Sequence, residues 1–472
     1  MRVRPPTLVA LFLAILVLSL WRAVCVLAGP DIDTDAYAHH MIARAILADP
    51  RDLALHWVWL PLFHYAQVPL VLLGGTLDAV RWINVLLTAA LPVVLFEYVC
   101  RTSRSRRSRM APEATALVAA LVAACCPIVM QMGTTGQPEP LFALLVLGVA
   151  IAFQRDRHVW TGVLLGAAVM TRYEAWAALG VVAVFVVYRR GRGWIAVAIP
   201  VALIFGWAAM RRPVDGEWFG FLRQTKQFAN DALHTRWGVV GDLLYYPVKT
   251  AYRVMGAVLP LAVLGVVRTL RQQGLRFVLV LAACLGFVSL TWVTRSSLGL
   301  DRHFVCVVPL YATFAAQGAT VIADVLAKVT RRPIAGRAVA GALAAGSLAG
   351  LLVQLDVWMG FWHGSIVRGW PERRAIAAYL DALPAGRTVY CDEATIELLT
   401  GLDRRRFDRH WIDDPHTWDL VQARAATDGV VYVATWRRKM RGHEQAGDIA
   451  FTAGADPSDP QGSGVAVMRV ER

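Results

Sequence analysis

Long apolar stretches separated by short polar connections fill most of the chain. A membrane-spanning helix needs about 20 mainly apolar residues, and eleven stretches reach or approach that length. They are residues 7–28, 79–99, 113–132, 138–154, 158–171, 174–188, 193–210, 251–267, 275–294, 304–326 and 337–357. The pattern predicts an α-helical polytopic membrane protein with about eleven transmembrane helices.

The charges between these stretches predict the orientation. Short connections rich in Lys and Arg stay on the cytoplasmic side of a membrane. With a cytoplasmic N-terminus, every second connection should be basic, and all five are. These are residues 101–109, 155–157, 189–192, 268–276 and 328–337. Eleven spans then place the C-terminus outside the cytoplasm.

The opposite face receives connections of a different character, which hold the carboxylates and most of the histidines. They are residues 29–78, 134–140, 171–176, 211–250 and 294–303. Within them, residues 36–48, 60–74 and 217–230 each predict a helix that lies along the outer interface, because these segments mix aromatic, apolar and basic side chains.

The last hundred residues change in character. Residues 371–472 are charged and alternate short β-branched runs, such as 428–436 and 464–470, with a helical segment after residue 394. This alternation is typical of a small α/β domain. We therefore divide the chain into a transmembrane domain, 1–365, and an extracytoplasmic α/β domain, 371–472.

Composition agrees with a membrane protein and excludes several other classes. The chain is 57% hydrophobic with a mean hydropathy of +0.48, too apolar for a soluble protein of this length. Its net charge of +14 comes from the basic connections, so no nucleic-acid partner is predicted. The seven cysteines form no CxxC pair, which disfavours disulfides and structural zinc. Arginine greatly outnumbers lysine, as in GC-rich bacteria, so we expect a bacterial plasma (inner) membrane protein whose first span is retained.

An acidic motif follows the first span directly. The stretch "GPDIDTDAYAHH", residues 29–40, places aspartates at 31, 33 and 35. If a helix begins near Thr34, Asp33 is its N-cap and Asp35 lies in its first turn, where the helix dipole favours negative charge. Ionisable groups at a membrane boundary are costly, so such a cluster also suggests a functional site.

Several outer-face motifs together resemble the GT-C glycosyltransferases, which take sugars from polyprenyl phosphate and include protein O-mannosyltransferases and the lipid A aminoarabinose transferase. The similar stretches are Asp33 with Tyr37 and Ala43-Arg44, then 56–87, 137–153, 171–176 and 301–318. The resemblance implies a GT-C type membrane domain with its active site on the outer face. O-mannosyltransferase-like members carry adjacent Asp-Glu, whereas here single residues separate the aspartates, which leaves the catalytic carboxylate open between Asp33 and Asp35.

The chemistry of such a transfer can be assigned to residue types. A base must take the acceptor's hydroxyl proton, and we assign it to Asp33 first and Asp35 second. One displacement would invert the anomeric configuration, because no second carboxylate suggests itself as a nucleophile. The departing lipid phosphate needs cations. Arg302, Arg172 and Arg295 are the candidates, although arginines at span ends also commonly reach to lipid headgroups.

Other polar groups on this face are candidates for contact with the substrate. They are Tyr37, His39, His56, His64, Glu139, Glu174 and His303. Arg172 and Glu174 have a structural ion pair as the equal alternative. No metal cofactor is predicted, though Asp33 and Asp35 are a possible divalent-metal pair. No glycine-rich phosphate loop is visible, which makes a nucleotide sugar a poor donor.

The predicted function is transfer of a sugar from a polyprenyl-phosphate donor to a lipid, glycan or protein acceptor. A transporter or lipid flippase is the alternative, since such proteins also have many spans and buried charges. They usually show internal repeats with charged or broken positions at mid-membrane, whereas the acids of this chain are in outer connections. A scaffold that displays the C-terminal domain would leave the outer-face motifs without a role.

Overall fold

The structure is a computed structural model of the chain, and it describes 11, 12, 15, 19–29, 31, 33–103, 110–190, 193–231, 238–368, 371–400, 402, 406–408, 412, 415–443, 445–454 and 464–471. It divides into two compact units. The first comprises residues 1–28 and 42–363, and the second comprises residues 29–41 and 364–472. Of the predicted first span, residues 7–10, 13, 14 and 16–18 lie outside the described residues.

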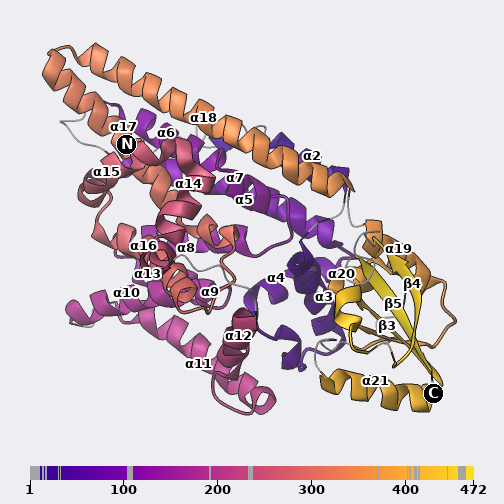
Figure 1. Cartoon of the computed structure of the whole chain (residues 1–472). Helices are drawn as coiled ribbons and strands as arrows, with labels where there is room; N and C mark the ends of the chain where they lie inside the picture. Colours follow the sequence, from indigo (N-terminus) through magenta and orange to yellow (C-terminus); the bar gives the residue numbers. More distant parts are fainter. Residues whose placement is uncertain are drawn as a thin grey trace. The chain divides into compact units, whose positions relative to one another are not determined.

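The first unit is α-helical throughout its described part (Figure 1). Its helices are α2 (Leu20–Ala28), α3 (Thr34–Ala48, which begins in the second unit), η1 (Leu53–His56), α4 (Leu62–Leu72), α5 (Leu77–Thr102), α6 (Pro112–Ala124), α7 (Pro127–Met132), α8 (Glu139–Gln154), α9 (His158–Val169), α10 (Glu174–Tyr188), α11 (Ile195–Asp215), α12 (Gly220–Asp231), α13 (Gly238–Leu243), the π-helical η2 (Tyr245–Thr250), α14 (Ala251–Met255), η3 (Gly256–Val258), α15 (Leu259–Gln272), α16 (Leu275–Val293), η4 (Asp301–Val307), α17 (Val308–Thr330) and α18 (Pro333–Arg368).

Six helical stretches among the described residues are long and apolar enough to cross a membrane. They are Leu77–Thr102, Ile195–Asp215, Tyr245–Gln272, Leu275–Val293, Asp301–Thr330 and Gly336–Gly364. Shorter apolar helices, among them α6, α8, α9 and α10, coincide with other predicted spans. The prediction of a polytopic α-helical chain is confirmed, while the count of eleven spans and their orientation stay predictions.

One predicted span is interrupted. Residues 113–132 were expected as a single helix, but the chain breaks between α6 and α7 at Cys125 and Cys126. Pro127 begins α7, and a proline cannot donate the backbone hydrogen bond that would continue the preceding helix. The predicted interface helices 36–48, 60–74 and 217–230 correspond to α3, α4 and α12.

The core of the first unit lies between α5, α6, α8, α16 and α17, where buried residues such as Leu95, Ala120, Val146, Leu281 and Ala312 pack together. The helix α17 is central, because 83% of its most apolar window is buried, whereas only 17% of the corresponding window of α18 is buried. An apolar helix that the protein itself does not cover is suited to contact lipid.

Helices α15 and α17 pack backbone against backbone. A Cβ atom added to Gly318 would overlap the carbonyl group of Leu261, and one added to Gly265 would overlap that of Phe314. Small residues commonly permit such close approach between membrane helices, where dispersion contacts replace the hydrophobic effect as the driving force.

The second unit contains a five-stranded sheet, which confirms the predicted C-terminal α/β domain. Its elements are α19 (Pro371–Asp381), β1 (Thr388–Cys391), α20 (Ala394–Leu399), β2 (Phe407–Asp408), α21 (Pro415–Asp428), β3 (Val430–Trp436), η6 (Arg437–Met440), β4 (Asp448–Ala453) and β5 (Val465–Glu471). The strand order is β2-β1-β3-β5-β4, with β1 parallel to β2 and β3, and β5 antiparallel to β3 and β4.

Alternate residues of β3 face two separate cores, as the period of a strand requires. Val431 and Val433 pack with Trp418 and Val421 of α21. Tyr432 and Ala434 pack in the second core, together with residues of α19 and α20. Helices therefore cover both faces of the sheet (Figure 1).

The packing of α15 against α17 gives a stability prediction. Gly318→Ala should lower the free energy of unfolding by about 1–3 kcal/mol, because the helices must separate to admit the methyl group. Thermal unfolding followed by size-exclusion chromatography in detergent measures the effect. The control is Gly286→Ala in α16, which has no atom within 4 Å of the added carbon. Equal behaviour of the two variants would contradict the close packing.

Candidate active site

Arg172 is the centre of a buried ion network in the first unit. It lies in the turn between α9 and α10, and its Nη1 donates to Oε1 of Glu139 at 2.5 Å. Its Nε and Nη2 donate to Glu174 at 2.9–3.2 Å. The side chains of Glu139 and Glu174 are only 2% and 5% exposed. Two nearly desolvated carboxylates thus share one guanidinium, whose planar fork suits this geometry.

The charges of this network keep Arg172 protonated. Burial alone would lower the pKa of Arg172, but the neighbouring Glu174 and Glu139 carboxylates outweigh burial and raise it. Arg172 is therefore a permanent positive charge at any pH at which the protein is folded. Removing one partner from such a buried group is costly, because the remaining charge cannot regain its hydration.

His303 and Arg302, at the start of η4, complete the cluster. Nδ1 of His303 lies 2.7 Å from Nη2 of Arg172 and 2.9 Å from Oε1 of Glu174. A protonated Nδ1 donates to Glu174, whereas an unprotonated one accepts from Arg172, so the histidine tautomer selects its partner. Nε of Arg302 lies 3.5 Å from Oε1 of Glu139. The other oxygen of Glu139, Oε2, is buried and has no hydrogen-bond partner among the described residues.

Two residues of α5 hold the connection that leads to Glu139. Nε of Arg81 donates to the carbonyl of Thr134 at 2.8 Å. Nδ2 of Asn84 donates to the carbonyls of Thr135 and Gln137 at 2.7 and 2.8 Å. Both side chains are buried. Neither residue was predicted to belong to the site, although two polar residues three apart in an apolar helix are a signal for such an anchoring function.

The acidic motif belongs to the second unit and begins α3 as predicted. Oδ1 of Asp33 accepts the backbone N–H of Asp35 at 3.1 Å, which is the N-cap arrangement. Oδ1 of Asp31 accepts the N–H of Asp33 at 3.0 Å. Asp31 is the most buried of the three, at 1% exposure, while Asp33 and Asp35 are partly exposed. The motif is thus a folded helix start whose second and third aspartates are partly exposed.

Tyr37 and His39 lie further along the same helix and are 3% and 2% exposed. Their predicted contact with substrate stays a proposal, and their burial does not favour it.

His56 and His64, two other predicted substrate contacts, form a buried pair. Their Nδ1 atoms are 2.8 Å apart, and both rings are fully buried. The ring of His56 also meets Trp207 edge-on. Burial, together with the positive charge of Arg211, lowers the pKa of His56 to about 4, so it is neutral near pH 7. These contacts favour a packing role for the pair.

Hydrogen bonds hold the segment that carries His56 against its neighbours. Nη1 of Arg211 donates to the carbonyl of Leu53 at 2.8 Å, and the Tyr173 hydroxyl donates to the carbonyl of Val58 at 2.8 Å. The backbone N–H of Leu62 donates to the carbonyl of Met170 at 2.9 Å. Asp215 in turn pairs with Arg211 at 2.6 Å. The segment from residue 53 to 62 is therefore fixed against the turn that bears Arg172.

Arg295 is not joined to the cluster by any contact in the described part of the chain. It follows the end of α16 with φ of 60°, and its backbone N–H donates to the carbonyl of Trp292 at 3.1 Å. Asp301, next to Arg302, pairs with Arg253, an ion pair that the sequence analysis did not anticipate.

The described residues offer no group of three or more His, Cys, Asp or Glu side chains that could hold a metal ion. One oxygen each of Asp31 and Asp33 already accepts a backbone N–H, so the spacing of the aspartates is explained by local structure.

Comparison with known proteins agrees with this architecture. The chain matches the model of "Glycosyltransferase family 87" over residues 57–296, just over half of its length. That range includes Glu139, Arg172 and Glu174. None of the curated proteins matches the sequence.

Solved structures share the fold at low sequence identity. ArnT from Cupriavidus metallidurans in the apo state has a TM-score of 0.62 and 14% identity, over 98% of this chain and 97% of that chain. The same protein bound to undecaprenyl phosphate gives 0.61 and 14%, over 99% and 98%. The archaeal oligosaccharyltransferase AglB from Archaeoglobus fulgidus, in complex with an inhibitory peptide and a dolichol-phosphate, gives 0.53 and 12%, over 92% and 70%.

The family match over half of the chain and the shared polytopic fold lead to the same conclusion as the outer-face motifs. The chain belongs to glycosyltransferase family 87 and is a membrane glycosyltransferase of the GT-C type.

Proposed function

We propose that the chain transfers a sugar from a polyprenyl-phosphate donor to a hydroxyl acceptor at the extracytoplasmic face of a bacterial plasma membrane. The observation that carries the proposal is the buried cluster of Arg172, Glu139, Glu174, Arg302 and His303. The structural relatives add support, since one is bound to undecaprenyl phosphate and another to a dolichol-phosphate. A transport function would not explain why the chain belongs to a glycosyltransferase family.

Within the cluster, Arg302 is the better candidate for the donor phosphate and Arg172 for organising the site. Three nitrogens of Arg172 are hydrogen-bonded to the two carboxylates. The contact of Arg302 with Glu139 is longer, 3.5 Å, and its side chain is 16% exposed. A guanidinium that keeps part of its surface accessible can pair with phosphate oxygens.

Glu139 and Glu174 also limit where an anion can bind. Their two negative charges repel a phosphate, so the phosphate must approach from the side of Arg302 and His303. Oε2 of Glu139, which is buried without a partner among the described residues, is an acceptor for a hydroxyl group. We therefore assign Glu139 to a sugar hydroxyl and Arg302 to the phosphate next to it.

The base in this mechanism is Asp33, with Asp35 as the rival. The carboxylate takes the proton of the acceptor hydroxyl as its oxygen forms a bond to the anomeric carbon. The bond between that carbon and the phosphate oxygen breaks, and the lipid phosphate leaves with the electron pair. A single displacement of this kind inverts the configuration. The N-cap bond to Oδ1 of Asp33 fixes the direction of its carboxylate, and Asp35 follows within the first turn.

Substitution of the aspartates tests the assignment of the base. Asp33→Asn should lower the transfer rate about 10²–10⁴-fold, because the amide cannot accept the acceptor's proton. An asparagine still caps a helix, so the fold should persist. The measurement is transfer in proteoliposomes from a panel of radiolabelled polyprenyl-phosphate sugars, with Asp35→Asn assayed in parallel. Loss only in Asp35→Asn would move the role to Asp35, and full activity in both variants would exclude this mechanism.

Substitution of Arg302 tests the phosphate contact. Arg302→Gln should reduce transfer about 10²–10³-fold, because a positive charge at the departing phosphate is lost. Arg212→Gln is the matched control, since Arg212 is exposed at the end of α11 and should retain activity. The same proteoliposome assay measures both. Equal activity of Arg302→Gln and Arg212→Gln would refute the contact.

A further inference from the structure

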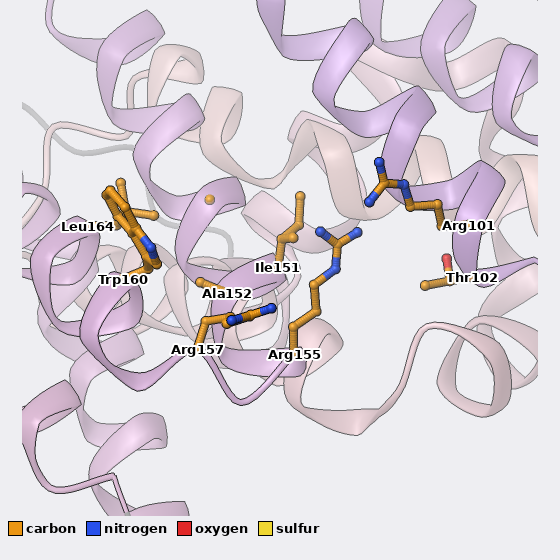
Figure 2. Close-up of a pocket in the computed structure, with 9 residues that line it drawn as sticks. Arg101, Thr102, Ile151, Ala152, Arg155, Arg157, Trp160 and Leu164 are labelled. Carbon is orange, nitrogen blue, oxygen red and sulfur yellow. The ribbon is translucent and has the colours of Figure 1, made fainter. Parts of the chain in front are cut away.

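A second cationic site lies at the other end of the helices that carry the active-site cluster. The end of α5, the end of α8 and the start of α9 enclose a pocket of about 570 Å³ (Figure 2). Arg101, Arg155 and Arg157 supply its polar lining, and Ile151, Trp160 and Leu164 supply much of its apolar lining. Pockets of this volume commonly hold small ligands.

Both arginines of the turn between α8 and α9 line the pocket, whereas the carboxylate of this turn, Asp156, pairs with residues outside the pocket. Asp156 adopts φ of 56° and pairs with Arg189 at 2.6 Å and with Arg276 at 2.7 Å. Its charge is therefore matched by arginines that do not line the pocket. Neither Arg155 nor Arg157 forms an ion pair with a carboxylate in the described part of the chain.

The remaining contacts hold Arg155 on the side of α5. Its guanidinium lies over the ring of Tyr98, with 5.8 Å to the ring centroid. Figure 2 shows Arg155 extending toward the side of Arg101, with Trp160 and Leu164 together on the opposite side. Arg101 pairs with Glu97, so three guanidinium groups face one nearby carboxylate. The pocket thus has a net positive charge, with Arg101 and Arg155 toward one side and the apolar side chains of Trp160 and Leu164 at the other.

The pocket lies where a lipid could enter it. Trp160 is 63% exposed, and tryptophan is enriched at the level of lipid headgroups. The connections on this side, 101–109, 155–157 and 189–192, are the basic ones. An anion with an apolar tail satisfies both halves of the lining, whereas a free inorganic anion satisfies only the arginines.

We propose that this pocket binds the phosphate group of an anionic membrane lipid, with Arg155 and Arg157 on the phosphate and Trp160 and Leu164 on the acyl chains. The site is separate from the proposed donor site. Helix α8 has 16 residues, with Glu139 first, and a helix rises about 1.5 Å per residue, so about 22 Å separates its two ends.

The test is lipid retention by the full chain. Wild-type protein and an Arg155→Gln/Arg157→Gln variant are extracted from phosphatidylcholine vesicles that contain phosphatidylglycerol, and bound lipid is measured by native mass spectrometry. A juxtamembrane arginine contributes about 1 kcal/mol to binding of anionic lipid, so the affinity should fall about 30-fold. Arg331→Gln/Arg332→Gln, exposed residues of another basic connection, should retain the lipid.

The two double variants are compared with each other, and lipid binding is compared with binding of glycerol phosphate. An equal decrease in both double variants would show a general effect of surface charge and would overturn the site. Glycerol phosphate, which lacks acyl chains, distinguishes the source of the phosphate. It should bind at least about 10-fold more weakly than the lipid, and equal binding would overturn the assignment to a lipid. Arg155→Lys/Arg157→Lys, which keeps the charges, should recover part of the affinity if the variants are folded.

Discussion

The ion network around Arg172 holds together the segments at one end of the first unit. One guanidinium holds two carboxylates that are at most 5% exposed, and the three side chains come from the start of α8 and the turn before α10. His303 adds the start of η4. Buried charges are tolerated only when each is paired and hydrogen-bonded. The network therefore fixes three segments, far apart in sequence, in one arrangement, and it leaves Arg302 at its edge.

Other polar contacts extend this arrangement outward. Arg81 and Asn84 hold the connection before α8, and Arg211 and Tyr173 hold the segment around residue 55. Each of these side chains donates to a backbone carbonyl. Irregular backbone next to a membrane needs such hydrogen-bond donors. The polar residues at the ends of the apolar helices therefore have a structural role as well as a proposed chemical one.

The fold could be predicted from the sequence to a large extent, because apolar length and basic connections are direct signals of membrane helices. The break at Pro127 was missed, since hydropathy does not register a lost backbone hydrogen bond. The ion pair between Arg172 and Glu174 was predicted as one of two alternatives, because the two residues are only two positions apart. Its contacts with Glu139 and His303 join residues 33 and 131 positions away, and only the tertiary structure supplies those. For His56 and His64, the residue type suggested contact with the substrate, whereas their burial favours a packing role.

Photolabelling tests whether the Arg172 cluster binds the phosphate of a polyprenyl lipid. A photoreactive undecaprenyl phosphate, with its reactive group beside the phosphate, is incubated with the protein in nanodiscs, irradiated and mapped by peptide mass spectrometry. We expect labels within residues 134–140, 171–176 or 295–303, and excess undecaprenyl phosphate should suppress them. Labels that spare all three segments, or that competition does not suppress, would contradict binding by the cluster.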